Sequence, residues 1–105
     1  MALDPPHIEQ LVVDALRTVY DPEIPVNIHE LGLIYGVDVS PEGHVTIRMT
    51  LTAAGCPAAQ VLPQEVEQRA RAVPGVTGVT VDLVFDPPWD MSRMSEAAKL
   101  ELGML

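Results

Sequence analysis

Ten prolines interrupt this sequence, and their positions restrict how long any helix or strand can run. Proline lacks a backbone N–H and has a fixed φ, so it is disfavoured in helix interiors and in central strands. Pro22 and Pro25 must end the first helical pattern, Pro74 the second helical pattern, and the Pro87-Pro88 pair the third strand pattern. The chain is therefore expected to consist of short elements joined by stiff turns.

Between these breaks, apolar residues recur at helical spacing in three segments and alternate in three others. Asp4 is expected to cap the first helix, with Pro5 in its first turn, and Gly43 and Gly103 fall where a turn and a helix end are expected. The segment around Pro22 and Pro25 is expected to be an irregular loop, followed by a single turn at residues 28–31. The expected order is helix 5–19, strand 33–39, strand 44–52, helix 57–73, strand 76–85 and helix 95–102.

This order predicts an α/β (α+β) fold, a two-layer sandwich formed by one domain over residues 1–105. The first two strands should form an antiparallel hairpin, with Leu33, Tyr35, Val37 and Val39 on one face. A right-handed crossover should place the third strand parallel to the second in a mixed three-stranded sheet. The helix residues Leu11, Ala15, Leu16 and Val66 are expected to pack on the strand residues Val45, Ile47, Met49 and Leu51.

The formal net charge is −9 and no basic stripe is present, so nucleic acid and anionic membranes are poor partners for this acidic protein. No stretch approaches the roughly 18 apolar residues that a bilayer crossing needs. The first residues lack a basic segment followed by an apolar run, the pattern of a secretory signal. The expected location is the cytoplasm.

Cys56 is the one cysteine, so an intrachain disulfide is impossible. It lies between a predicted strand and a predicted helix, where the helix dipole and unpaired N–H groups favour a thiolate. A thiolate there can bind metal or attack an electrophile. A buried structural cysteine is the alternative interpretation.

Four other polar residues are candidates for the same site. Strand alternation places Thr50 and Thr52 on one face beside the cysteine loop, where their hydroxyls can bind a ligand or simply meet solvent. Asp21 and Glu23 can ligate iron or act as acid and base, although Asp-Pro-Glu is also common in turns. The three histidines, His7, His29 and His44, are far apart in sequence and are expected to be solvated.

An apolar cluster is expected near the C-terminus. It comprises Phe85, Trp89, Met91 and Met94. Covering the core is its expected role, and a partner-binding lid is the alternative.

Four motifs, in order, resemble those of the SufT/PaaD-type iron–sulfur cluster assembly family. They are residues 21–35 (DPEIPVNIHELGLIY), residues 50–57 (TLTAAGCP), residues 73–76 (VPGV), and residues 86–90 (DPPWD) followed by residues 94–99 (MSEAAK). Each motif alone is weak, but together they span nearly the whole chain. The resemblance implies an iron–sulfur cluster assembly domain-like fold and an accessory role, not an enzymatic one, in cluster assembly or delivery.

The resemblance also implies where the site is and what it contacts. The family's site corresponds to Asp21, Glu23, Thr50, Thr52 and Cys56, with Cys56 as a transient metal ligand. NifU-like scaffolds carry a second cysteine three residues later, and this chain has Ala59 there. We therefore expect at most a transient iron–sulfur cluster or iron, a homodimer, and contacts with the assembly machinery and with apo client proteins.

Two alternatives remain. One is a PaaD-like helper of a multicomponent oxygenase, although PaaD-like proteins usually carry a cysteine-rich extension and this sequence ends at Leu105 without one. The other is a small cysteine-dependent enzyme, which would need a base near Cys56, and no histidine is close to it in sequence.

Overall fold

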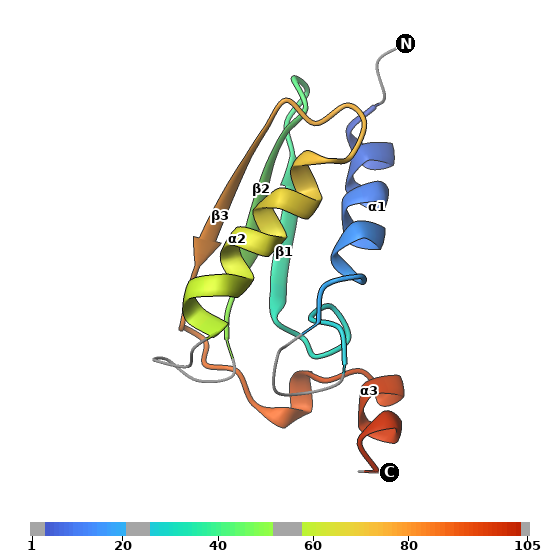
Figure 1. Ribbon diagram of the computed structural model, residues 1–105, viewed down its shortest axis with the longest axis vertical. Helices are drawn as coiled ribbons and strands as arrows, with labels where there is room; N and C mark the ends of the chain where they lie inside the picture. The colour runs from blue at the N-terminus through green and yellow to red at the C-terminus, as the bar shows by residue number, and fades with distance from the viewer. Residues whose placement is uncertain (1–3, 21–25, 52–57, 104–105) are drawn as a thin grey trace.

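The computed structural model describes residues 4–20, 26–51 and 58–103 of the chain. Two long helices lie against a sheet, and a C-terminal segment crosses one end of both (Figure 1). The elements, in chain order, are α1 (Pro5–Leu16), β1 (Ile34–Val39), β2 (His44–Met49), α2 (Ala58–Arg71), β3 (Gly78–Leu83), the 3₁₀ turn η1 (Met91–Arg93) and α3 (Glu96–Glu101).

The sheet has the expected mixed topology, with the order β1-β2-β3. β1 pairs antiparallel with β2, and β3 runs parallel to β2, which places α2 in the connection between the two parallel strands. The β1–β2 register shifts between Ile34 and Gly36. This irregularity puts Ile34 against the core and Tyr35 beside Arg48, so the prediction that Tyr35 shares a face with Val37 was wrong.

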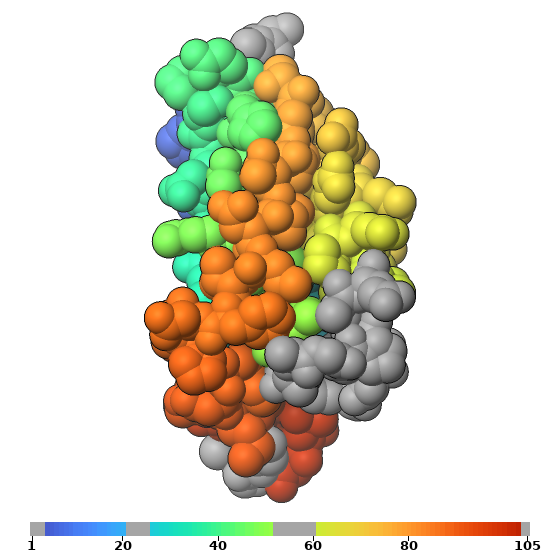
Figure 2. Space-filling model, turned by 90° about the vertical axis from the view of Figure 1, so that its left-hand side faces the viewer, coloured from blue at the N-terminus to red at the C-terminus, as the bar shows by residue number. Residues whose placement is uncertain are grey.

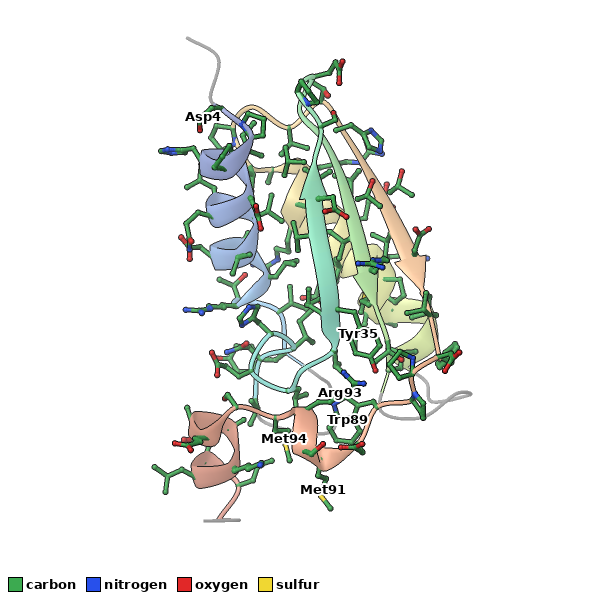
Figure 3. All side chains as sticks on the ribbon, turned by 180° about the vertical axis from the view of Figure 1, so that it is seen from behind. Asp4, Tyr35, Trp89, Met91, Arg93 and Met94 are labelled. Atoms are coloured by element: carbon green, nitrogen blue, oxygen red, sulfur yellow. The ribbon has the colours of Figure 1, made fainter. Side chains whose placement is uncertain are left out.

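Both long helices lie on the same side of the sheet, as the views from front and back agree (Figures 1 and 3). α1 packs on β1 and on α2, whereas α2 packs on β3. Asp4 caps α1 as expected, because its side chain accepts a hydrogen bond from the backbone N–H of His7 at 3.0 Å. α1 ends at Leu16, three residues earlier than the apolar pattern predicted, and α2 continues through Pro63.

The core is aliphatic and lies between the helices and the sheet. Leu16 and Val66 are fully buried, and Leu11 and Ala15 are partly buried against the same cluster. The predicted strand face is buried as well, at Val45, Ile47, Met49 and Leu51. The predicted packing of this face on the helices is confirmed.

The segment from Val26 to Leu33 contributes more to the core than expected of a loop. Four of its residues are at most 5 % exposed: Val26, Ile28, Leu31 and Leu33. Ile28 is hydrogen-bonded at both ends, since its N–H donates to Val19 O at 2.9 Å and its carbonyl accepts from Leu33 N at 3.1 Å. The expected turn at residues 28–31 is present, with Leu31 N donating to Asn27 O.

The C-terminal segment docks on that buried segment. Trp89 Nε1 donates to Leu31 O at 2.7 Å, and Ser95 N donates to Glu30 O at 2.9 Å. Gly32 has φ +82°, and a Cβ there would collide with the backbone of Arg93. Glycine at this position therefore allows η1 to lie directly against residues 31–33.

The predicted apolar cluster covers the core only in part. Met94 is buried and Trp89 packs against the core, but Phe85 and Met91 are exposed. Figure 3 shows Met91 pointing away from the body of the protein. In the adjacent turn, hydrogen bonds from Ser92 hold the pKa of Asp90 below its ordinary value.

Figure 2 shows the outer side of β3 between the β1–β2 hairpin and α2. No described element covers β3 in this view. Within the described ranges, no helix combines the length and apolar character needed to cross a membrane.

Candidate functional site

Thr50 follows the last residue of β2 and is fully buried. Its N–H donates to Leu33 O at 2.8 Å, while the preceding residue, Met49, accepts from Val84 N at 2.8 Å. Both neighbouring chain segments therefore hold the backbone at this strand end. Thr50 was expected to face solvent or a pocket, and its burial shows that the solvated alternative was wrong.

The Thr50 hydroxyl has no hydrogen-bond partner among the described residues. A buried polar group left unpaired costs about 1–3 kcal/mol, so native proteins rarely retain one without a reason. Neighbouring segment 52–57 lies outside the described residues. Within the described part of the chain, a buried hydroxyl without a partner thus lies at the strand end that leads toward the cysteine loop.

The other four predicted site residues, Asp21, Glu23, Thr52 and Cys56, lie outside the described residues. The chain that flanks them is described. Tyr20 and Asn27, on either side of residues 21–25, pair with each other in an isolated antiparallel bridge.

A continuous run of backbone hydrogen bonds joins that bridge to Thr50. Val19 O accepts from Ile28 N, Ile28 O accepts from Leu33 N, and Leu33 O accepts from Thr50 N. The residues that flank Asp21 and Glu23 are thus connected, through one buried segment, to the strand end that leads into the cysteine loop.

His29 differs from the sequence expectation. Its Nδ1 atom is buried and has no hydrogen-bond partner within the described part of the chain, and it lies 3.8 Å from Glu30 Oε1. The side chain retains 32 % of its accessible surface. Sequence reasoning missed this partial burial because the segment around His29 follows neither a helical nor a strand period.

Across residues 4–20, 26–51 and 58–103, no three histidine, aspartate or glutamate side chains are grouped so that they could hold a metal ion. The described chemistry at the strand end is therefore that of a hydroxyl and of backbone groups.

These features define a small two-layer α/β protein with a buried threonine where the central strand ends. A family model described as iron–sulfur cluster assembly protein matches residues 9–82, from within α1 almost to the end of β3. The chain belongs to this family, and the resemblance predicted from its four motifs is confirmed.

Relatives with assigned roles match over nearly their full length. The chain is 56% identical over 97 residues to an Fe-S protein maturation auxiliary factor of Porphyromonas gingivalis, covering 92% of each chain. It is 40% identical to the Fe-S protein maturation auxiliary factor SufT of Staphylococcus aureus, covering 82% of this chain and 98% of that one. These matches confirm the expected accessory role in iron–sulfur cluster assembly.

Solved structures confirm the expected fold. A domain of unknown function from Bacillus anthracis aligns with a TM-score of 0.90 at 36% identity, covering 96% of both chains. A conserved hypothetical protein from Thermotoga maritima aligns with a TM-score of 0.79 at 34% identity, covering 90% of this chain and 93% of that one.

Proposed function

We propose that this protein is a SufT-like accessory factor that holds an iron–sulfur cluster, or iron, as a transient cargo and passes it to apo client proteins. The similarity to maturation auxiliary factors supports the role, and part of the chain is also 39% identical to an iron–sulfur cluster carrier protein of Mycobacterium tuberculosis. The observation that carries the proposed site is the buried hydroxyl of Thr50, which has no partner among the described residues and lies at the strand end that leads toward Cys56.

In this proposal Cys56 supplies the thiolate. It precedes Ala58, the first residue of α2, by two positions, so the positive end of the helix dipole stabilises the deprotonated sulfur. The proposed pocket also includes the carboxylates of Asp21 and Glu23, whose negative charge would oppose formation of the thiolate. The balance gives a moderately activated sulfur, suited to a ligand that must release its cargo.

The hydroxyls of Thr50 and Thr52 complete the pocket. A hydroxyl is both a donor and an acceptor, and hydrogen bonds to sulfur adjust the stability of a cluster. Because Thr50 is buried and its hydroxyl has no partner among the described residues, it can bond to the thiolate or to a cargo sulfide without first giving up a hydrogen bond to one of those residues. This residue therefore favours cargo binding without requiring a rearrangement of the sheet.

One thiolate per chain cannot hold a cluster alone, since clusters usually have four protein ligands. We infer that two copies each provide Cys56, and that a client protein or a small thiol provides the remaining ligands. Binding that depends on a partner is easily reversed, which suits delivery. The same dependence fits a non-enzymatic role, because no chemical step on the cargo is needed.

Anaerobic reconstitution tests this function. The purified protein is incubated with iron and sulfide, with and without a small thiol, and its visible absorption and mass are measured without air. We expect an iron–sulfur chromophore on a dimer, and its loss in Cys56→Ser. Thr46→Val, which alters a hydroxyl elsewhere on β2, is the matched control and should keep the chromophore. A Cys56→Ser variant that retains it, or a wild-type protein that never acquires it, would contradict cargo binding.

A further inference from the structure

A cavity of about 510 Å³ opens on the outer side of the sheet, where the C-terminal segment crosses its end. Small-molecule sites commonly occupy roughly 300–1,000 Å³, so its size suits a small ligand. Its lining combines apolar walls with two arginines and one carboxylate. The lining residues include Ile34, Tyr35, Arg48, Val84, Asp86 and Arg93.

Arg48 reaches this cavity because the strand opposite it carries no side chain. Its register partner on β1 is Gly36, and a Cβ at Gly36 would lie 2.8 Å from Arg48 Nη2. The guanidinium therefore lies against the backbone of β1 in space that any other residue would occupy.

Arg93 is held from a different direction. Its guanidinium carbon lies 4.6 Å from the centre of the Tyr35 ring, and the Tyr35 hydroxyl donates to Pro87 O at 2.8 Å. Figure 3 shows Arg93 directly below Tyr35 at the end of β1. Stacking fixes the plane of the guanidinium and leaves its N–H edge available to donate.

Neither guanidinium forms an ion pair within the described part of the chain, although Asp82 is the β3 register partner of Arg48. Hydrogen bonds from Ser92 and, to a lesser extent, the charge of Arg93 lower the pKa of Asp90. Arg69 and Arg71 form ion pairs along α2, whereas no described carboxylate lies within 4.0 Å of Arg48 or Arg93. Asp86 lines the cavity without reaching either guanidinium. On a protein of net charge −9, two of the six basic side chains thus converge on one cavity.

We propose that this cavity binds a small multivalent oxyanion, either a polycarboxylate or a phosphate compound. Both chemistries offer paired oxygens that match the fork of N–H donors on a guanidinium. Two arginines from separate parts of the chain would contact two ends of such a ligand, and the apolar walls of Ile34 and Val84 would contact its carbon skeleton. The site is separate from the proposed cargo pocket and goes beyond the proposed function.

Titration calorimetry on the iron-free protein tests the site with two probes, tricarballylate for carboxylates and pyrophosphate for phosphates. Sodium chloride at matched ionic strength corrects for general screening. We expect saturable binding of at least one probe, and the one that binds identifies the ligand class. Arg48→Gln should weaken binding about tenfold or more, because a hydrogen bond to a charged group contributes about 1.5–3 kcal/mol. Arg48→Lys keeps the charge but loses the forked pair of N–H donors, so it should recover only part of the affinity that Arg48→Gln loses.

Two further variants distinguish a local site from the effect of net charge. Arg17→Gln removes an exposed charge from the end of α1 and should change affinity less than about twofold, whereas Asp86→Asn should strengthen binding. Heat denaturation of each variant verifies that it is folded. Absence of saturable binding for both probes, or equal losses in Arg48→Gln and Arg17→Gln, would overturn the proposal. Because no iron or sulfide is present, its failure would leave the cargo function untouched.

Discussion

Thr50 combines full burial with a hydroxyl that has no partner among the described residues. If no other residue of the chain pairs with it, this hydroxyl destabilises the ligand-free fold, because its hydrogen bonds to water are lost and the described residues do not replace them. A protein that retains such a group gains something else from it. We interpret the hydroxyl as a donor reserved for the cargo or for the cysteine thiolate.

Replacing Thr50 by valine separates the effect of the hydroxyl on stability from its effect on cargo binding. Valine has nearly the same shape, so Thr50→Val should leave the free energy of unfolding unchanged or raise it by about 1 kcal/mol. The same variant should lose or weaken the iron–sulfur chromophore. Denaturant melts and anaerobic reconstitution provide the two readouts, with Thr46→Val as the control on the same strand. A loss of more than about 1 kcal/mol in Thr50→Val would mean that the hydroxyl is satisfied in the folded protein.

Gly32 is the residue on which the docking of the C-terminal segment depends. Its positive φ disfavours any side chain, and the backbone of Arg93 occupies the place of a Cβ. Gly32→Ala should therefore cost more than about 2 kcal/mol, the sum of a left-handed conformation and a steric collision.

Gly103 provides a matched control for this prediction. It also has a positive φ, +74°, but a Cβ there would meet no atom within 4 Å. Gly103→Ala should cost only the backbone term of about 1–2 kcal/mol. Equal losses in the two variants, measured by denaturant unfolding, would show that the close approach to Arg93 contributes nothing.

The two long helices and three strands were largely predictable because each carries a clear apolar period and ends near a proline, glycine or polar turn. The parallel placement of β3 followed from the handedness of the crossover. The bulge at Tyr35 was not predictable, since Tyr35 fits the alternation as well as Ile34 does. Pro63 is an exception of the opposite kind. Proline is disfavoured in a helix interior, yet α2 continues through this residue.

Leu16 is one of three residues that α1 buries in the core, together with Ile8 and Val12, and it is fully buried. Leu16→Ala removes buried methyl groups and leaves a cavity, so the free energy of unfolding should fall by about 2–5 kcal/mol. Leu100→Ala in α3 is the control, because Leu100 is 66% exposed and its truncation should cost less than about 0.5 kcal/mol. A loss below about 0.5 kcal/mol for Leu16→Ala would mean that α1 contributes little to the core.

In the whole molecule, segment 26–33 connects elements that are distant in sequence. It is hydrogen-bonded to the end of α1, to Thr50 and to the C-terminal segment. Sequence reasoning described its first part as an irregular loop, because its four buried residues follow neither a helical nor a strand period. Tertiary contacts, not local preference, determine this part of the fold.

The candidate site, like segment 26–33, could be predicted from the sequence only in part. Thr50 could be placed at the end of a strand from alternation alone, but its burial depends on chain segments from three parts of the sequence. Cys56, Asp21 and Glu23 were candidates from residue type and position, and the resemblance to a family favoured their functional interpretation over the structural alternatives. Their grouping with Thr50 stays a prediction.

Complementation tests whether the protein delivers cargo through Cys56. In a strain that lacks this protein, the activity of an iron–sulfur enzyme is measured after supplying wild type, Cys56→Ala or Thr46→Val, with each protein's abundance and melting curve as controls. We predict that wild type and Thr46→Val restore the activity, and that Cys56→Ala is folded and equally abundant but does not. Full restoration by Cys56→Ala would contradict a role for the thiolate and leave the protein as an adaptor that never binds the cargo.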